Sequence, residues 1–170
     1  MPTVAALTRF VLAHPHLFVL TGAGISTGSG IPGYRDGEGN WRRKAPVTHQ
    51  QFVGREDVRK RYWARSLQGW PTIAAAAPNA AHLALVRLER AGLVGKLVTQ
   101  NVDGLHQRAG SSDAVDLHGS LDAVVCMQCG DRQPRAALQV MLRAANPAFG
   151  VASARVAPDG DADLDVEFDA

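Results

Sequence analysis

Small and polar side chains gather in four short segments of this sequence, and each segment could do chemistry. The first is "TGAGISTGSGIPGYRD" at residues 21–36, whose glycines would let a phosphate approach the backbone closely. The second, "TQNVDGLHQRAG" at residues 99–110, supplies amides and carboxylates, and the third, "DLHGS" at residues 116–120, supplies a base for neutral pH. The fourth, "CMQCG" at residues 126–130, is a cysteine pair that indicates a metal or redox element in a reducing compartment.

Each segment also has a plain structural explanation when it is taken alone. The glycines match a dinucleotide-binding fingerprint imperfectly, because Thr27 stands at the third glycine's position and Gly28 comes one residue later. A tight turn between a strand and a helix explains them about as well. His118 could equally be a buried, hydrogen-bonded histidine, and Asn101 and Asp103 could be turn formers. The segments therefore predict a function only in combination.

Apolar and β-prone runs at residues 17–20, 95–99 and 114–117 predict the strands that position these segments. A helix is predicted over residues 4–13, and another in "PNAAHLALVRLERAGLV", capped by Asn79 and ended near Gly92. Strand, crossover helix and strand are typical of a parallel α/β sheet, whose ligands bind beyond the carboxyl ends of the strands. We therefore expect the polar segments to converge on one cleft.

Residues 37–78 are predicted to form a mainly helical insertion over an edge of the sheet. The expected parts are a polar loop "GEGNWRRKAP", a helix in "REDVRKRYWARSL" and a turn at "GWP". The stretch "APDGDADLDVEFDA" is acidic and poor in core-forming residues, and we expect it to be a mobile loop or tail.

Length and composition indicate one globular domain, because the chain has 170 residues of which 46% are apolar. Residues 155–170 hold six of the 16 acids, so residues 1–154 carry 17 basic and 10 acidic residues, a formal charge of +7. This charge suits anionic ligands such as phosphates, but no nucleic-acid recognition motif accompanies it, which disfavours DNA binding. No run approaches the roughly 20 apolar residues of a membrane span. We expect no membrane association and a cytoplasmic location, with a mitochondrial one left open.

In this order and spacing, the four segments closely resemble the sirtuins, the NAD-dependent protein lysine deacylases. "RYWARSLQGWP" followed by "PNAAHLAL" resembles the class II branch, which has bacterial and mitochondrial members. The resemblance extends from Phe18 to Gly130 and implies an α/β fold with a Rossmann-like parallel sheet and a small zinc-ribbon module. Residues 1–125 would form the NAD-binding domain, and residues 126–170 would form half of the zinc module with the acidic tail.

The resemblance also implies a role for each site residue. Asn101 and His118 would be catalytic, with His118 as the general base, and Gln100, Asn101 and Asp103 would contact the ribose and the nicotinamide carboxamide. The glycine-rich segment and its continuation would bind the rest of NAD through Gly22, Ala23, Gly24, Ser26, Ile31, Pro32, Tyr34 and Arg35.

In the implied reaction, the carbonyl oxygen of an acyl-lysine in a protein or peptide attacks the nicotinamide ribose, and nicotinamide leaves. His118 then helps to deprotonate a ribose hydroxyl, which attacks the resulting imidate and gives free lysine and O-acyl-ADP-ribose. NAD is consumed as a co-substrate in this reaction. A dehydrogenase is disfavoured, because no acidic residue follows the glycines at about 20 residues to hold the ribose.

Some features depart from the sirtuin pattern. Gly33 stands where many sirtuins have an acid, and Tyr34 stands where phenylalanine is common. The pattern lacks a clear tyrosine and arginine pair that desuccinylating relatives use, but several side chains nearby leave the acyl preference open: Arg42, Arg43, Tyr62 and Arg65.

Cys126 and Cys129 are the only cysteines, so they would provide two of the four zinc ligands that a structural site needs. Because the family's later strands are also missing, we expect a C-terminally truncated chain. One hypothesis is a deacylase that a longer native chain or a partner completes. The alternative is an impaired remnant that binds NAD or ADP-ribose or acts through protein contacts. In such a partial fold, an unpaired sheet edge would favour self-association.

Overall fold

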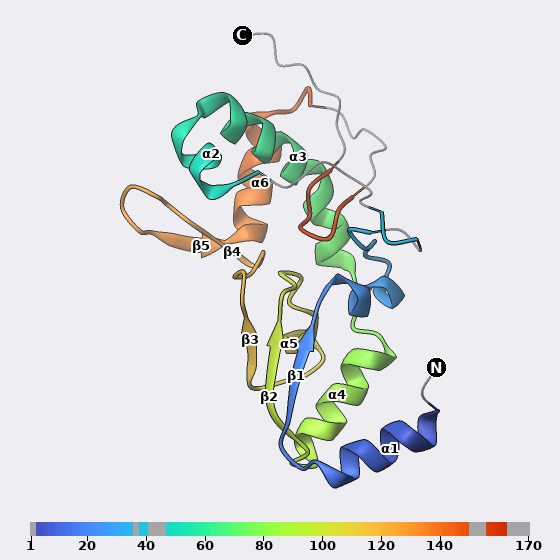
Figure 1. The fold of residues 1–170 in the computed structure, drawn as a ribbon. Helices are drawn as coiled ribbons and strands as arrows, with labels where there is room; N and C mark the ends of the chain where they lie inside the picture. Colours follow the sequence, from blue (N-terminus) through green and yellow to red (C-terminus); the bar gives the residue numbers. More distant parts are fainter. Residues whose placement is uncertain (1–2, 36–37, 41–46, 150–155, 163–170) are drawn as a thin grey trace.

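The computed structural model describes residues 3–35, 38–40, 47–149 and 156–162, and it shows two lobes (Figure 1). The lower lobe holds the parallel sheet with helices α1 (Val4–Ala13), α4 (Ala80–Arg90) and α5 (Leu105–Arg108). The upper lobe holds α2 (His49–Gly54), α3 (Glu56–Ala75), α6 (Arg135–Ala145) and a hairpin of two strands. Arg42 and Arg43, which the sequence analysis named in connection with acyl preference, lie outside the described residues, and so does most of the expected acidic tail.

The sheet has the predicted parallel arrangement. Its strands β1 (Leu17–Thr21), β2 (Val94–Thr99) and β3 (Ala114–Asp116) lie in the order β1-β2-β3, and both pairs are parallel. Thr21 pairs with Thr99, and Thr99 pairs with Asp116, so the three carboxyl ends are level. The first three polar segments follow the carboxyl ends of these strands and therefore lie at the same edge of the sheet, as expected.

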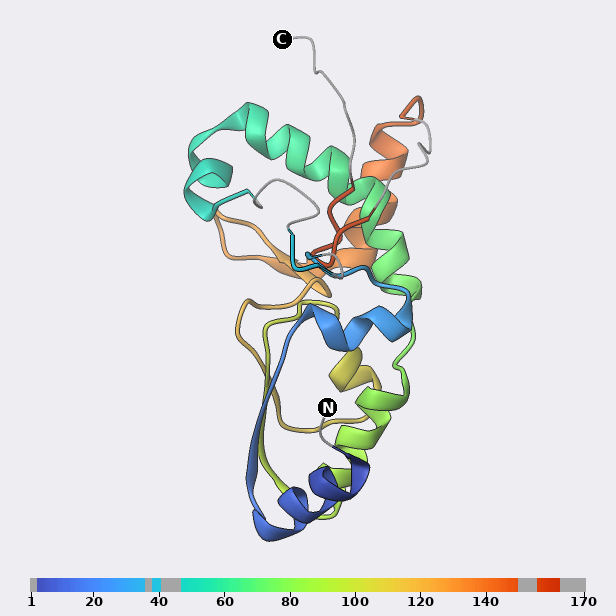
Figure 2. The same ribbon diagram turned by 45° about the vertical axis from the view of Figure 1, so that its right-hand side comes forward.

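Helix α4 begins and ends where the local sequence signals predict. The side chain of Asn79 caps its first turn by accepting hydrogen bonds from the backbone N–H groups of Ala81 and His82. Beyond its end, Gly92 has φ +72°, the left-handed conformation that glycine adopts without strain. Figure 2 shows α4 and α5 on one side of the sheet.

The upper lobe is held together by a buried polar contact between α3 and α6. Arg135, only 2% exposed, donates to the hydroxyl of Ser66, and its guanidinium lies 4.8 Å from the centre of the Trp70 ring. Gln139 donates to the backbone carbonyl of Leu67. The helical insertion therefore lies beyond the carboxyl ends of the strands and against α6 (Figure 1), rather than over an edge of the sheet as expected.

The predicted turn at "GWP" is wrong, because α3 continues through Gly69 and Pro71 to Ala75. Ile73, in its last turn, is buried in a core cluster with Ile31 and Leu105, which anchors the segment. Arg108 binds the carbonyl oxygens of Ile73, Ala74 and Ala76 and so satisfies the end of the helix. Tertiary contacts thus override the local preference of proline to end a helix.

Among the described residues, no helix is both long enough and apolar enough to cross a membrane.

Candidate functional site

A cavity of about 840 Å³ opens where the sheet's carboxyl ends meet the upper lobe. Five residues of the predicted site line it, and they come from the first three of the four polar segments: Ala23, Tyr34, Gln100, Asn101 and His118. This volume lies within the range of about 300–1,000 Å³ that is usual for small-molecule sites. The expected convergence on one cleft is therefore confirmed in the geometry.

Beside the cavity, three side chains form a buried hydrogen-bond network. Ser26 is 1% exposed and donates its hydroxyl to Oδ2 of Asp103 at 2.6 Å, and Nδ2 of Asn101 donates to Oγ of Ser26 at 3.0 Å. The other carboxylate oxygen of Asp103 accepts the N–H of Leu105 at 2.9 Å. Because every member is buried and bonded, the network holds Asn101 in a fixed orientation at the cavity wall.

Arg108 is hydrogen-bonded to the backbone of this network at Asp103. It donates to the backbone carbonyl of Asp103 at 2.7 Å and also to carbonyls at the end of α3. Its partners at the end of α3 lie more than 30 residues away along the chain, so no local pattern in the sequence identifies Arg108 as part of the site. It joins the polar loop after β2 to the upper lobe.

His118 is exposed and lies at the cavity wall. The interpretation of His118 as a buried structural histidine is therefore wrong. The buried histidines are instead His82 and His106, which are 0% and 1% exposed and whose ring centres lie 4.9 Å apart. Burial lowers the pKa of both imidazoles, and the proximity of His82 lowers that of His106 further.

The glycines at the start of the loop border open space. A Cβ atom added at Gly22 or Gly24 would meet no heavy atom within 4 Å. Gly22 and Gly24 thus leave room for a bulky group against the backbone of the loop. Ala23, which lies between them, lines the same cavity as the polar side chains of Gln100 and Asn101. The residues present fit a dinucleotide such as NAD.

The continuation of the loop divides between the core and the surface. Ile31 is 1% exposed and packs with Ile73 and Leu105, so it belongs to the core cluster and not to the cavity lining. Pro32 is half-buried, and Arg35 is exposed and donates to the carbonyl of Gly39 at 2.7 Å. Their predicted contacts with NAD stay predictions, and of this stretch only Tyr34 lines the cavity.

The upper lobe closes the cavity with four further residues, of which the sequence pointed only to Tyr62, as a residue that leaves the acyl preference open. His49 and Tyr62 come from α2 and α3, and Asp159 and Asp161 come from the described part of the acidic stretch. Burial raises the pKa of Tyr62, and the negative charge of Asp159 raises it further. Arg65 donates to the carbonyl of Ala162 at 2.7 Å. Such contacts between distant segments leave no signal in a single sequence.

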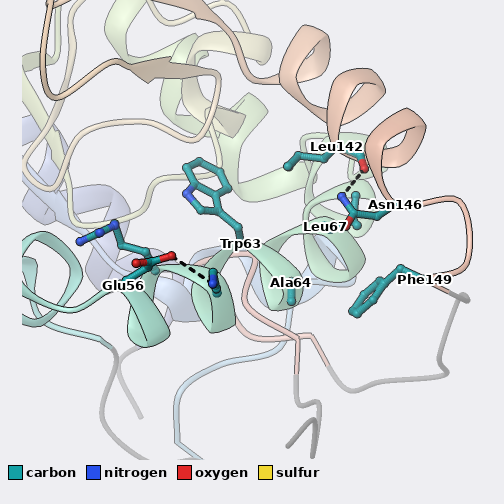
Figure 3. A pocket seen from close by; sticks show the side chains of 9 residues that line it. Glu56, Trp63, Ala64, Leu67, Leu142, Asn146 and Phe149 are labelled. Atoms are coloured by element: carbon teal, nitrogen blue, oxygen red, sulfur yellow. Dashed lines mark hydrogen bonds and ion pairs between the residues drawn. The ribbon is translucent and has the colours of Figure 1, made fainter. Parts of the chain in front are cut away.

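A second cavity, of about 590 Å³, lies between α3 and α6, away from the polar segments (Figure 3). Its apolar walls include Trp63, Leu67, Leu142 and Phe149, and Asn146 donates to the carbonyl of Leu142 at its rim.

Cys126 and Cys129 lie at the tip of the hairpin formed by β4 (Ala123–Val125) and β5 (Arg132–Pro134). Backbone N–H groups of Cys129 and Gln128 point at the Cys126 sulfur and lower the pKa of this thiol, which favours the thiolate that binds metals. Within the described residues, however, no group of three His, Cys, Asp or Glu side chains could hold a metal ion. These residues supply half of a four-ligand zinc site and do not complete one.

The chain is similar to known proteins over most of its length. Residues 22–156 match the Sir2 family. An NAD-dependent protein deacetylase of Xanthomonas axonopodis pv. citri is 57% identical over 159 residues, which make up 94% of this chain and 54% of the relative. The chain therefore spans about half the length of this curated relative.

Two solved structures have the same fold. A complex of a Sir2 homologue with NAD has a TM-score of 0.61 and 38% identity, and covers 76% of this chain and 51% of its own. A complex of Sir2 with a p53 peptide and NAD has a TM-score of 0.64 and 30% identity, and covers 79% of this chain and 53% of its own. These likenesses agree with the predicted Rossmann-like α/β fold.

Proposed function

Because the chain belongs to the Sir2 family, we propose that it forms the NAD-binding and catalytic part of an NAD-dependent protein lysine deacylase. The observation that carries this proposal is the cavity lined by Ala23, Gln100, Asn101 and His118 beside the network of buried polar groups. The relative from Xanthomonas is named an NAD-dependent protein deacetylase, which supports the same activity here.

Each part of the site has a task in this proposal. Gly22, Ala23 and Gly24 border the open space for the phosphates, and Gln100 and Asn101 contact the nicotinamide ribose and carboxamide. Asp103 acts by fixing Ser26, which in turn holds the Asn101 amide. NAD supplies the electrophilic ribose carbon that the acyl oxygen of the substrate attacks.

His118 accepts a proton from a ribose hydroxyl in the proposed mechanism. Its exposure at the cavity wall suits this task, because the imidazole can reach a bound ligand and pass the proton on to water. The substrate class is acyl-lysine in proteins or peptides, and the Sir2 structure with a bound peptide supports this choice.

Release of nicotinamide from NAD tests the proposal. We expect the wild-type chain to release nicotinamide in the presence of an acetyl-lysine peptide and to form free lysine over many turnovers. We expect His118→Ala to lower the steady-state rate of free-lysine formation at least 100-fold, because His118 acts after nicotinamide has left and general base catalysis contributes roughly 10²–10⁴-fold. The affinity for NAD, measured by calorimetry, should change little. His14→Ala is the matched control, since His14 is also exposed but lies at the end of α1.

Three other outcomes would contradict parts of the proposal. NAD binding without any release by the folded wild-type chain would support the alternative, a remnant that binds the nucleotide. Loss of NAD binding in His118→Ala would assign His118 a structural role. Absence of NAD binding by the folded wild-type chain would overturn the function altogether.

A further inference from the structure

The glycine-rich loop, residues 22–30, is attached to the fold by side chains that do not line the cavity. Most of the loop is a 3₁₀ helix, η1 (Ala23–Ser29). Asn79, which precedes α4, is bonded to Ile25 in the middle of the loop and to Ser29 near its far end. Thr21, which precedes the loop, contacts His106 of α5. We refer to Asn79, His82 and His106 as the loop clamp.

Asn79 bonds in two directions at once. Its Oδ1 accepts from the N–H groups of Ala81 at 2.9 Å and His82 at 3.4 Å, which caps α4. Its Nδ2 donates to the carbonyl of Ile25 at 2.7 Å and to the hydroxyl of Ser29 at 3.0 Å. Only the first pair of bonds serves the helix. The second pair fixes the loop to the start of α4.

The contact between Asn79 and the loop is close. A Cβ atom at Gly28 would lie 3.2 Å from Nδ2 of Asn79, which is tighter than most real contacts of a Cβ atom. Gly28 is the glycine that falls outside the dinucleotide fingerprint. Its lack of a side chain allows the amide of Asn79 to lie against the loop.

His82 and His106 connect Asn79 to Thr21, at the other end of the loop. Nδ1 of His82 accepts the backbone N–H of Asn79 at 3.3 Å, and the His82 ring packs edge-on against the ring of His106. Nε2 of His106 lies 2.9 Å from Oγ1 of Thr21. A continuous chain of contacts, buried at its two histidines, therefore runs from the end of the loop, through α4 and α5, back to its beginning.

We propose that Asn79 is a positioning residue for NAD, which acts by holding the glycine-rich loop through its side-chain amide. This inference rests on the proposed NAD-binding function of the loop. Ser26, a member of the buried network beside the cavity, lies within η1 between the anchored ends. An unanchored loop must be ordered when the ligand binds, and that cost weakens affinity.

Two substitutions separate this role from the capping of α4. Asn79→Ser and Asn79→Asp both retain a side chain that caps helices well, but both remove the amide that donates to Ile25 and Ser29. Because serine is neutral, agreement between the two variants excludes an effect of added negative charge on an anionic ligand. Asn146→Ser is the matched control, since its amide bonds the carbonyl of Leu142 at the end of α6.

Hydrogen exchange and NAD binding are measured on each variant of the full chain. We expect both Asn79 variants to exchange amide hydrogens faster at residues 22–30, with no change at residues 80–90. We expect the Kd for NAD to rise roughly five- to tenfold, the effect of losing about one good hydrogen bond. Asn146→Ser should change neither quantity.

Unchanged exchange in residues 22–30, or equal loss of protection in α4, would overturn the positioning role. Faster loop exchange with unchanged NAD affinity would overturn it as well. Absence of NAD binding by the folded wild-type chain would instead contradict the proposed function, because the exchange measurement still reports on the clamp without a ligand.

Discussion

Single side chains in this site serve the fold and the proposed chemistry together. One oxygen of the Asp103 carboxylate accepts the N–H of Leu105 and stabilises a turn, and the other accepts the hydroxyl of Ser26. Turn formation and a place in the ligand site are therefore compatible roles for Asp103. The amide of Asn79 shows the same division, with one atom for a helix and the other for a loop.

Buried histidines predict a dependence of stability on pH. Burial lowers the pKa of both His82 and His106. The positive charge of Arg108 lowers the pKa of His82 further, and the negative charge of Asp103 raises it. At His106, the negative charges of Asp103, Asp116 and Glu89 likewise raise the pKa against the larger effect of burial. Below about pH 6.5 the unfolded chain binds protons at these positions and the folded chain does not. The free energy of unfolding is therefore highest above about pH 6.5 and falls as the pH falls toward the lowered values.

Urea unfolding at pH 7.5, 6.5 and 5.5 measures this dependence. His82→Gln should make the free energy of unfolding depend less steeply on pH. Glutamine at this position can still accept the N–H of Asn79, but it does not titrate. A free energy of unfolding that is the same at pH 7.5 and 5.5 would show that the buried pair does not resist protonation.

At the scale of elements, the packing of α3 depends on a glycine inside the helix. A Cβ atom at Gly69 would overlap the backbone carbonyl of Gly160, so the segment around residues 156–162 can approach α3 only because Gly69 has no side chain. In an exposed helix, Gly→Ala would stabilise by about 1 kcal/mol. Here we expect Gly69→Ala to destabilise by roughly 1–3 kcal/mol, the usual cost of overpacking.

The control for this change is Gly54→Ala, in the last residue of α2, where a Cβ atom would meet nothing within 4 Å. Thermal unfolding of both variants gives the comparison. If Gly69→Ala melts at or above the wild-type temperature, the close approach of residues 156–162 to α3 does not persist in solution.

At the scale of the whole molecule, one face of the sheet carries exposed apolar side chains on and beside its edge strands. Phe18, Leu20 and Leu117 are 68%, 54% and 53% exposed, and the register of the strands places Leu20 and Val115 on the same face as Val98. Within the described residues, β1 and β3 are also the edges of the sheet. Parallel sheets are normally covered on both faces, so this surface favours association.

We expect the purified chain to self-associate, with an average sedimentation coefficient that rises with concentration. Replacing Phe18 and Leu20 together by serine should shift the equilibrium toward monomer. Val53→Ser is the control, because Val53 is exposed and apolar but lies on α2 in the other lobe. Equal association of the wild type and the double variant would exclude this face as the contact.

Local signals in the sequence are enough to predict the three strands, α1 and α4, and to place the polar segments after the strands. Periodicity, the cap at Asn79 and the glycine after α4 are local signals, and parallel strands bring their carboxyl ends to one edge. These signals predict that the segments holding Ala23, Asn101 and His118 converge, and the three residues line one cavity.

The roles of the remaining residues depend on tertiary contacts. These contacts carry α3 through Pro71, place Ile31 in the core, and join Asn79, His82 and His106 into a clamp on the loop. The cause is the same in all three cases. Each outcome depends on contacts between residues that are far apart along the chain, and neither periodicity nor capping carries information about such contacts.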